Sequence, residues 1–372
     1  MAGTIESMQP TTNGDGLRRN QLIFGLVVLA ALIALFLWGR DRFHFDFGVF
    51  RSQLALADWR RIGVGAGCIY LGYVFRSVRW AYLLRHNKKV PMLSLLGTQV
   101  MGFTAVALIG RVADPVRPYL VARKTGLPLS NQFAVYIVER LFDAGSTALL
   151  FSSAILLTAW FGVPGDLPHP ELVKKAGYWG MALTLAGALF LVAVRFAGGA
   201  VATLLDGALS AVSKKVGHAV GNKIREFRTG LDTMRSFSDF GVVASLSVGM
   251  WLLIAAAYLE TTKAFVASPE LASMTATKCI LLMVVSGVTS IVQLPVIGWF
   301  TQIGLVAAAI SSFFGAAPEA ATACAATILL VTFLCIVPVG LIWAQFEHVS
   351  LRKVTVESEH AEEDLETSKA AE

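Results

Sequence analysis

The chain has 372 residues, of which 55% are hydrophobic and 15% are charged, and its mean hydropathy is +0.65. Soluble domains carry about 25% charged residues, so this composition excludes a globular domain with an ordinary polar surface. The formal net charge of +6 comes from Lys and Arg residues gathered between apolar stretches, which indicates membrane topology and no nucleic-acid partner.

Apolar runs of helical length predict an all-α polytopic membrane protein. They lie at about 22–39, 62–84, 93–110, 131–160, 177–197, 241–266, 276–294, 298–315 and 319–344. Residues 1–21 are polar and predicted to be a disordered cytoplasmic terminus, and no small-residue cleavage site follows the first run, so we expect an uncleaved anchor. A span needs about 20 apolar residues, so some of these runs are too short or too interrupted to cross the bilayer simply.

Basic clusters give the orientation. Residues 85–89, 117–124 and 198–240 are rich in Lys and Arg and are predicted to be cytoplasmic, whereas 161–176 and 267–275 contain proline and few Arg and are predicted to lie outside. We expect the 198–240 connection to be amphipathic and to lie on the anionic inner leaflet. The acidic tail, 349–372, is predicted to be disordered and cytoplasmic.

Two interrupted segments predict re-entrant hairpins. Segment 93–110 has basic clusters on both sides, and a full crossing there would place Arg117 and Lys124 outside. Segment 276–315 is broken near Pro295, and whether it is a hairpin or two full spans is left open. Broken segments in the two halves of a polytopic chain indicate a midplane site in transporters, and they allow an inverted repeat. With two hairpins, about six full spans remain, at 22–39, 62–84, 131–160, 177–197, 241–266 and 319–344.

Neither the cysteines nor the histidines indicate a cofactor. All four cysteines lie in apolar segments without CxxC spacing, and the six histidines lie in loops or at segment ends without metal-ligand spacing. No nucleophile elbow or phosphate-binding glycine motif occurs in the right context. We therefore expect no metal, no cofactor and no catalytic residue.

Charges at membrane depth cost about 2.5–3.5 kcal/mol each, so they are candidates for function. Arg76 and Arg79 share one helix face at i,i+3 spacing. One interpretation is an anion clamp, because arginine binds phosphate oxygens bidentately. The other is snorkelling to the interface beside Trp80.

A second group follows Gly110, at the return of the first predicted hairpin. Arg111 and Arg117 are separated by Asp114, and two prolines bend the backbone there. The arginines are predicted to meet a phosphate, with Asp114 orienting one of them. The alternative is a cytoplasmic loop with local ion pairs.

A third group opens the run that reaches Trp160. Glu139 and Asp143 lie one turn apart, and Arg140 can pair with Asp143 at i,i+3. These carboxylates are expected either to pair with the arginines of the preceding loop or to exchange protons; the alternative is a structural network that fixes helix register. Gln293 and Gln302 flank the second interruption and are predicted to line the same cavity.

The string GRVADPVRPYLVARKTGLPLSNQFAVYIVERLFD at 110–143 resembles the transmembrane region of the lysylphosphatidylglycerol synthase/flippase family. The Arg-Ser-Val-Arg-Trp sequence at 76–80 is similar to the family's Arg-x-x-Arg-Trp, and QLPVIGWFTQIGLVAAAISSFFG at 293–315 resembles its second signature. The resemblance implies one flippase-like domain over 22–348. It also implies a bacterial cytoplasmic membrane protein. The family's synthases carry a soluble aminoacyl-transferase domain, which this sequence lacks, so we expect no lysyl transfer.

Two functions follow as hypotheses. The first is translocation of an anionic phospholipid or a polyprenyl phosphate, held by the arginines named above. The alternative is a membrane-embedded enzyme or accessory subunit that modifies a lipid or a lipid-linked glycan. Membrane lipids are the expected partners, and a homo-oligomer is left open.

Overall fold

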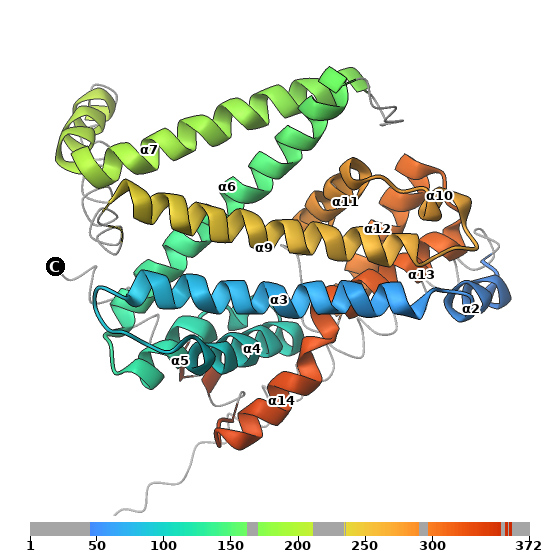
Figure 1. Cartoon of the computed structure of the whole chain (residues 1–372), viewed down its shortest axis with the longest axis horizontal. Coiled ribbons are helices and arrows are strands. Elements are labelled where there is room, and N and C mark those ends of the chain that lie inside the picture. Colours follow the sequence, from blue (N-terminus) through green and yellow to red (C-terminus); the bar gives the residue numbers. More distant parts are fainter. Residues whose placement is uncertain are drawn as a thin grey trace, which may run out of the picture. The chain divides into compact units, whose positions relative to one another are not determined.

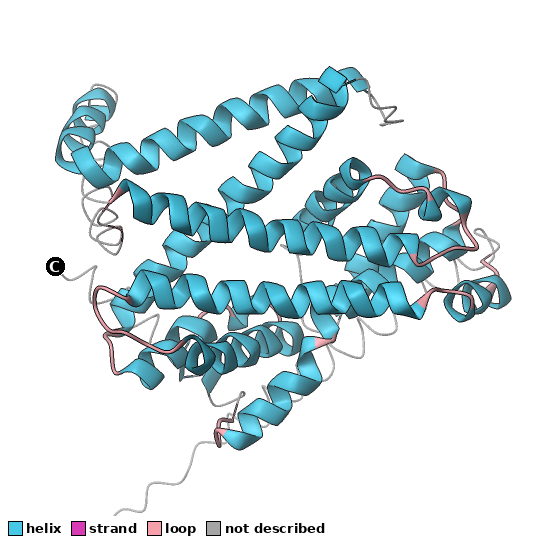
Figure 2. Ribbon diagram, in the orientation of Figure 1, coloured by secondary structure: helices cyan, strands magenta, loops and turns pink. Residues whose placement is uncertain are grey.

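The computed structural model describes residues 45–161, 170–210, 234, 236–289, 297–350, 354–355 and 357–358, and every regular element in these ranges is helical (Figure 2). The first predicted run, 22–39, and most of the 211–235 stretch of the basic connection lie outside the described residues. Residues 49–372 form one unit, which the following paragraphs describe.

The predicted runs within the described ranges form helices. These are α2 (Phe47–Ala55), α3 (Trp59–Leu84), α4 (Met92–Ile109), α5 (Val116–Thr125), α6 (Leu129–Phe161), α7 (Pro170–Ser210), α9 (Phe237–Lys263), α10 (Pro269–Ala272), α11 (Ala276–Thr289), α12 (Ile297–Phe314), α13 (Pro318–Leu329) and α14 (Ile336–Phe346). A π-helical turn, Leu330–Leu334, joins α13 to α14. Five described stretches are long and apolar enough to cross a membrane: α4, α6, α7, α9 and the continuous α13–α14. An all-helical multi-pass protein is therefore confirmed, and the number of full spans stays a prediction.

Helices α3 and α9 lie side by side and run antiparallel (Figure 1). Arg61 near the start of α3 pairs with Glu260 near the end of α9 at 2.8 Å, and Arg85 after α3 pairs with Asp239 at the start of α9. A side chain at Gly65 would approach α9 to 3.0 Å, so glycine permits the close packing that membrane helices favour.

Helices α4 and α5 fold back on each other. Gly110 ends α4 with a φ of 98°, a conformation that favours glycine, and a short 3-10 turn leads into α5. The Arg117 side chain of α5 lies directly against Gly102 of α4. Lys88, before α4, donates a hydrogen bond to the Thr125 carbonyl at the end of α5 (2.6 Å). The chain therefore returns to the end from which it entered, which is the geometry that a re-entrant hairpin requires.

Helices α11 and α12 form a second antiparallel pair. Gln302 of α12 donates to the Ser286 hydroxyl of α11 (3.2 Å), and Lys278 near the start of α11 lies over the ring of Phe314 at the end of α12 (5.9 Å). The turn between them, with Gln293 and Pro295, lies outside the described residues.

Several predicted cytoplasmic segments meet at one end of this unit. The 86–92 loop and the α5–α6 connection are joined by the Lys88 bond, and Lys124 pairs with Glu347, after α14, at 2.6 Å. Four residues of the tail expected to be disordered are described as helical; Val354 is buried against α5, and Tyr119 donates to Glu357 (2.9 Å).

Helix α7 also continues beyond the predicted boundary at 197. The backbone at Ala197 is kinked, and the helix runs on to Ser210. The beginning of the predicted 198–240 connection is therefore an extension of α7, which the alanines and leucines at 200–208 favour.

Cysteine labelling tests this arrangement of ends. In a background without the four natural cysteines, Lys89→Cys and Ser130→Cys should react with a membrane-impermeant maleimide only after cells are permeabilised, because both sites are exposed at the basic end. Ser273→Cys, exposed at the other end of α9, should react in intact cells. Labelling of Lys89→Cys and Ser130→Cys from opposite sides would contradict the hairpin formed by α4 and α5.

Candidate functional site

A cluster of buried charges forms where α3, α5 and α6 meet. Helix α3 supplies Arg76 and Arg79, one turn apart; α5 supplies Arg117; and α6 supplies Glu139, Arg140 and Asp143. The spacing predicted from the sequence places each set on one helix face. This cluster is called the arginine network below.

Arg79 holds the network together. It is 1% exposed, and its guanidinium donates to Glu139 at 2.6 Å and to Asp143 at 2.7 Å. It also donates to the hydroxyl of Ser247 on α9 at 2.6 Å. These are short, charge-assisted hydrogen bonds, so one side chain joins α3, α6 and α9. Arg79 is therefore enclosed among protein groups, and the anion clamp stays a prediction.

Arg76 and Arg117 approach the same carboxylates less closely. Arg76 lies 3.3 Å from Glu139 and 3.4 Å from Asp143. Arg117 is fully buried, lies 3.4 Å from Glu139 and donates to the amide oxygen of Gln99 at 3.2 Å. The ring of Phe103 faces the Arg117 guanidinium at 4.5 Å, which stabilises its charge.

Arg140 differs from its neighbours. It lies 3.2 Å from Asp143 and 3.7 Å from Glu139, but its Nε and Nη2 donate no hydrogen bond within the described residues. Its side chain is 32% exposed and lies over the Tyr136 ring at 5.3 Å. Arg140 is therefore held by charge and stacking, and these two nitrogens are enclosed by the protein.

The arginine network carries more positive than negative charge. Four guanidinium groups surround two carboxylates, which leaves an excess of two positive charges among these residues. Buried Nε and Nη2 of Arg117 and Nε2 of Gln99 also have no hydrogen-bond partner in the part of the chain that the structure describes. Uncompensated buried charge is costly, so the site favours an additional anion.

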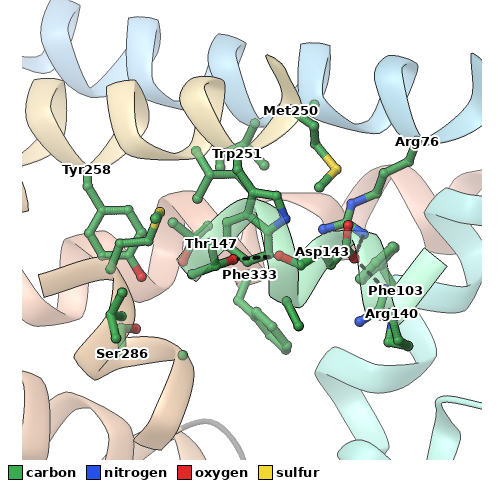
Figure 3. Close-up of a pocket in the computed structure, with 18 of the residues that line it drawn as sticks. Arg76, Phe103, Arg140, Asp143, Thr147, Met250, Trp251, Tyr258, Ser286 and Phe333 are labelled. Atoms are coloured by element: carbon green, nitrogen blue, oxygen red, sulfur yellow. Dashed lines mark hydrogen bonds and ion pairs between the residues drawn. The ribbon is translucent and has the colours of Figure 1, made fainter. Parts of the chain in front are cut away.

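A cavity of about 740 Å³ opens beside the network, a volume within the range of about 300–1,000 Å³ of small-molecule sites. Figure 3 shows Arg76, Arg140 and Asp143 at one end and Tyr258 and Ser286 at the other. Apolar and aromatic side chains also line the cavity, among them Phe151, Met250, Trp251, Ile254 and Phe333, and Phe103 lies beside Arg140 at the charged end (Figure 3). The cavity therefore combines a charged end with an apolar body.

The length of the cavity is comparable with half the thickness of the hydrocarbon core of a membrane. On α6 its lining extends from Arg140 to Phe151. At about 1.5 Å per residue, these positions are roughly 16 Å apart, which is about half of a 30 Å hydrocarbon core.

The structure divides the predicted site residues into three groups. Arg76, Arg111, Asp114, Arg140, Asp143 and Gln302 line the cavity. Arg79, Arg117 and Glu139 lie behind its wall, in the buried part of the network. Gln293 lies outside the described residues. Arg111 pairs locally with Asp114 at 3.7 Å, as one interpretation of that loop expected.

Sequence reasoning missed the neutral members of the site. Gln99 and Ser247 contact the arginine network, and Trp251 and Tyr258 line the cavity. Gln99 had a usable signal, because it is the one amide inside the apolar run 93–110. The others have none: serine and aromatic residues are common in membrane helices.

A model of the lysylphosphatidylglycerol synthase TM region matches residues 22–340. No curated protein and no solved structure matches the chain.

Removing Arg79 should destabilise the protein strongly. Arg79→Met leaves Glu139 and Asp143 with a weaker set of partners, and breaking a buried ion pair costs about 3–5 kcal/mol. The thermal midpoint in detergent should fall by several degrees. Arg60→Met, which removes an exposed arginine from the same helix, is the control and should leave the midpoint unchanged. Equal midpoints for the two variants would show that Arg79 does not hold the network.

Gly102 should also be sensitive, because a Cβ there would collide with the Arg117 side chain. Gly102→Ala should destabilise by about 1–3 kcal/mol, the usual cost of overpacking. Gly241→Ala on α9, where a Cβ meets nothing within 4 Å, is the matched control. The comparison is made by thermal unfolding, and a Gly102→Ala midpoint equal to that of the control would contradict the packing of α5 on α4.

Proposed function

The chain belongs to the lysylphosphatidylglycerol synthase TM region family, and on this premise we propose that it binds the phosphate of a membrane lipid and moves the headgroup across the membrane. The observation that carries the proposal is the excess of guanidinium groups over carboxylates beside an amphipathic cavity. A phosphate would supply the missing negative charge, and acyl or prenyl chains would fit the apolar body.

Arg140 is the proposed first contact of the phosphate. It lines the cavity and is the most exposed arginine of the network, with a side chain that is 32% exposed. A guanidinium offers two parallel donors that match two phosphate oxygens. Arg76 and Arg111, which also line the cavity, would contact the remaining oxygens. Arg79 and Arg117 would act through Glu139 and Asp143, as positioning residues.

The carboxylates explain how such a site stays stable when empty. Asp143 lies 3.2 Å from Arg140 and takes the place of a counter-ion. An entering phosphate would replace Asp143 at Arg140, while Arg79 and Arg76 keep Asp143 paired. Asp143 thus keeps arginine partners before and after binding, and the phosphate adds the negative charge that the empty network lacks.

The proposed topology has about six full spans, two re-entrant hairpins and, between the two halves, an inverted repeat. Support comes from the cavity walls: α4 and the turn after it contribute Phe103, Arg111 and Asp114, and the α11–α12 pair contributes Ser286 and Gln302. Interrupted helices around a midplane site are typical of secondary transporters. In this proposal the basic end and both termini face the cytoplasm of a bacterial cell, and the ligand is an anionic phospholipid or a polyprenyl phosphate.

The test is lipid translocation in reconstituted vesicles with a fluorescent anionic phospholipid and a membrane-impermeant quencher. Arg140→Ala should slow translocation about tenfold to a hundredfold, as expected from the loss of charged hydrogen bonds. Arg140→Lys should recover little of the rate, because a point charge cannot replace the planar fork. Arg60→Ala is the control, with an exposed arginine outside the network.

A wild-type rate for Arg140→Ala and for Arg111→Ala would overturn the phosphate site. Absence of translocation by the wild-type protein, with lipid still bound at the arginines, would favour a lipid-modifying enzyme or accessory subunit.

A further inference from the structure

A side-chain hydrogen bond joins the two helical pairs. The indole Nε1 of Trp299 donates to the carbonyl of Ala107 at 3.1 Å. Trp299 lies in the first turn of α12, and Ala107 lies in the last turn of α4. The bond therefore joins the turn-side ends of the α4–α5 and α11–α12 pairs.

The Ala107 carbonyl needs such a partner. Helix α4 ends at Ile109, and the Gly110 amide bonds to Val106, so Ala107 is among the last carbonyls that a helix leaves without an internal partner. Ala107 is 2% exposed, and a buried carbonyl without a hydrogen bond is costly. The indole of Trp299 meets this need from another element.

Among the described residues, the two helices have different main neighbours. Helix α4 lies against α3, α5 and α14, whereas α12 lies against α11 and α13. The cavity adjoins the bond on both sides: Val106 precedes Ala107, Gln302 lies one turn after Trp299, and both line the cavity. The Trp299 bond therefore connects two helix ends whose main packing partners differ.

We propose that Trp299 is a positioning residue that latches the two pairs together and closes the seam beside the cavity. Opening the latch would widen the cavity, and the indole would return to Ala107 when the cavity empties. What passes through the seam rests on the proposed function, but the closure itself does not.

Accessibility of the cavity tests the latch. Thr147→Cys places a thiol on the cavity wall in a background without the natural cysteines. Its reaction with a water-soluble maleimide is timed in detergent without added phospholipid. Trp299→Phe keeps the ring and removes the donor, so labelling should become about threefold to tenfold faster, the factor that one ordinary hydrogen bond contributes. Trp299→His keeps a ring N–H that can donate to Ala107. Labelling of the thiol should therefore be slower in the His variant than in the Phe variant.

Trp179→Phe is the matched control, because Trp179 is 77% exposed on α7 and does not line the cavity. Equal labelling in Trp299→Phe and the parent protein, or equal labelling in the Phe and His variants, overturns the latch. A Phe variant that does not fold while the His variant does would assign the bond to folding and also overturn it. Because labelling needs no lipid transport, failure here is distinct from failure of the phosphate site.

Discussion

The structure depends on the rule that a charge buried away from water must have a partner of opposite charge. Arg79 meets that rule with two carboxylates, and the three groups draw together α3, α6 and, through Ser247, α9. Helices α3 and α6 would each be a costly membrane segment alone, because each carries ionisable groups along an apolar run. When their charged side chains pair with one another, the charged faces of the helices point toward the protein interior. The apolar faces are then available to contact lipid. The same pairing places Arg140 at the edge of the cavity.

The fold around this network follows from how the chain reverses direction. Gly110 ends α4, and α5 returns along it. Because Gly102 has no side chain, the Arg117 side chain can pass against α4 and reach Glu139. A continuous helix through this region would carry Arg117 away from α6. The reversal therefore completes the network and at the same time exposes Arg111 and Asp114 to the cavity.

The sequence predicts much of this arrangement, because charges in apolar runs are rare and their partners are few. The helices, the antiparallel course of α4 and α5, and the meeting of Glu139 with Arg117 follow from basic clusters, proline and glycine positions, and helical spacing. The sequence does not predict which arginine of the network faces the cavity. Arg117 and Arg140 look alike in the sequence and both contact Tyr136, yet Arg117 is also enclosed by Phe103 and Gln99 and is fully buried, whereas the Arg140 side chain is 32% exposed. That difference arises from packing between helices, which local patterns do not encode. The Trp299 bond to a main-chain carbonyl is hidden for the same reason.

The central claim is that a lipid phosphate binds at Arg140, and an electron cryo-microscopy map of the protein in nanodiscs of phosphatidylglycerol tests it most directly. The account predicts phosphate density at hydrogen-bonding distance from the Arg140 guanidinium, about 2.7–2.9 Å for charged partners, with acyl-chain density along Met250 and Ile254. Acyl-chain density against Arg140, with the phosphate elsewhere, would contradict it.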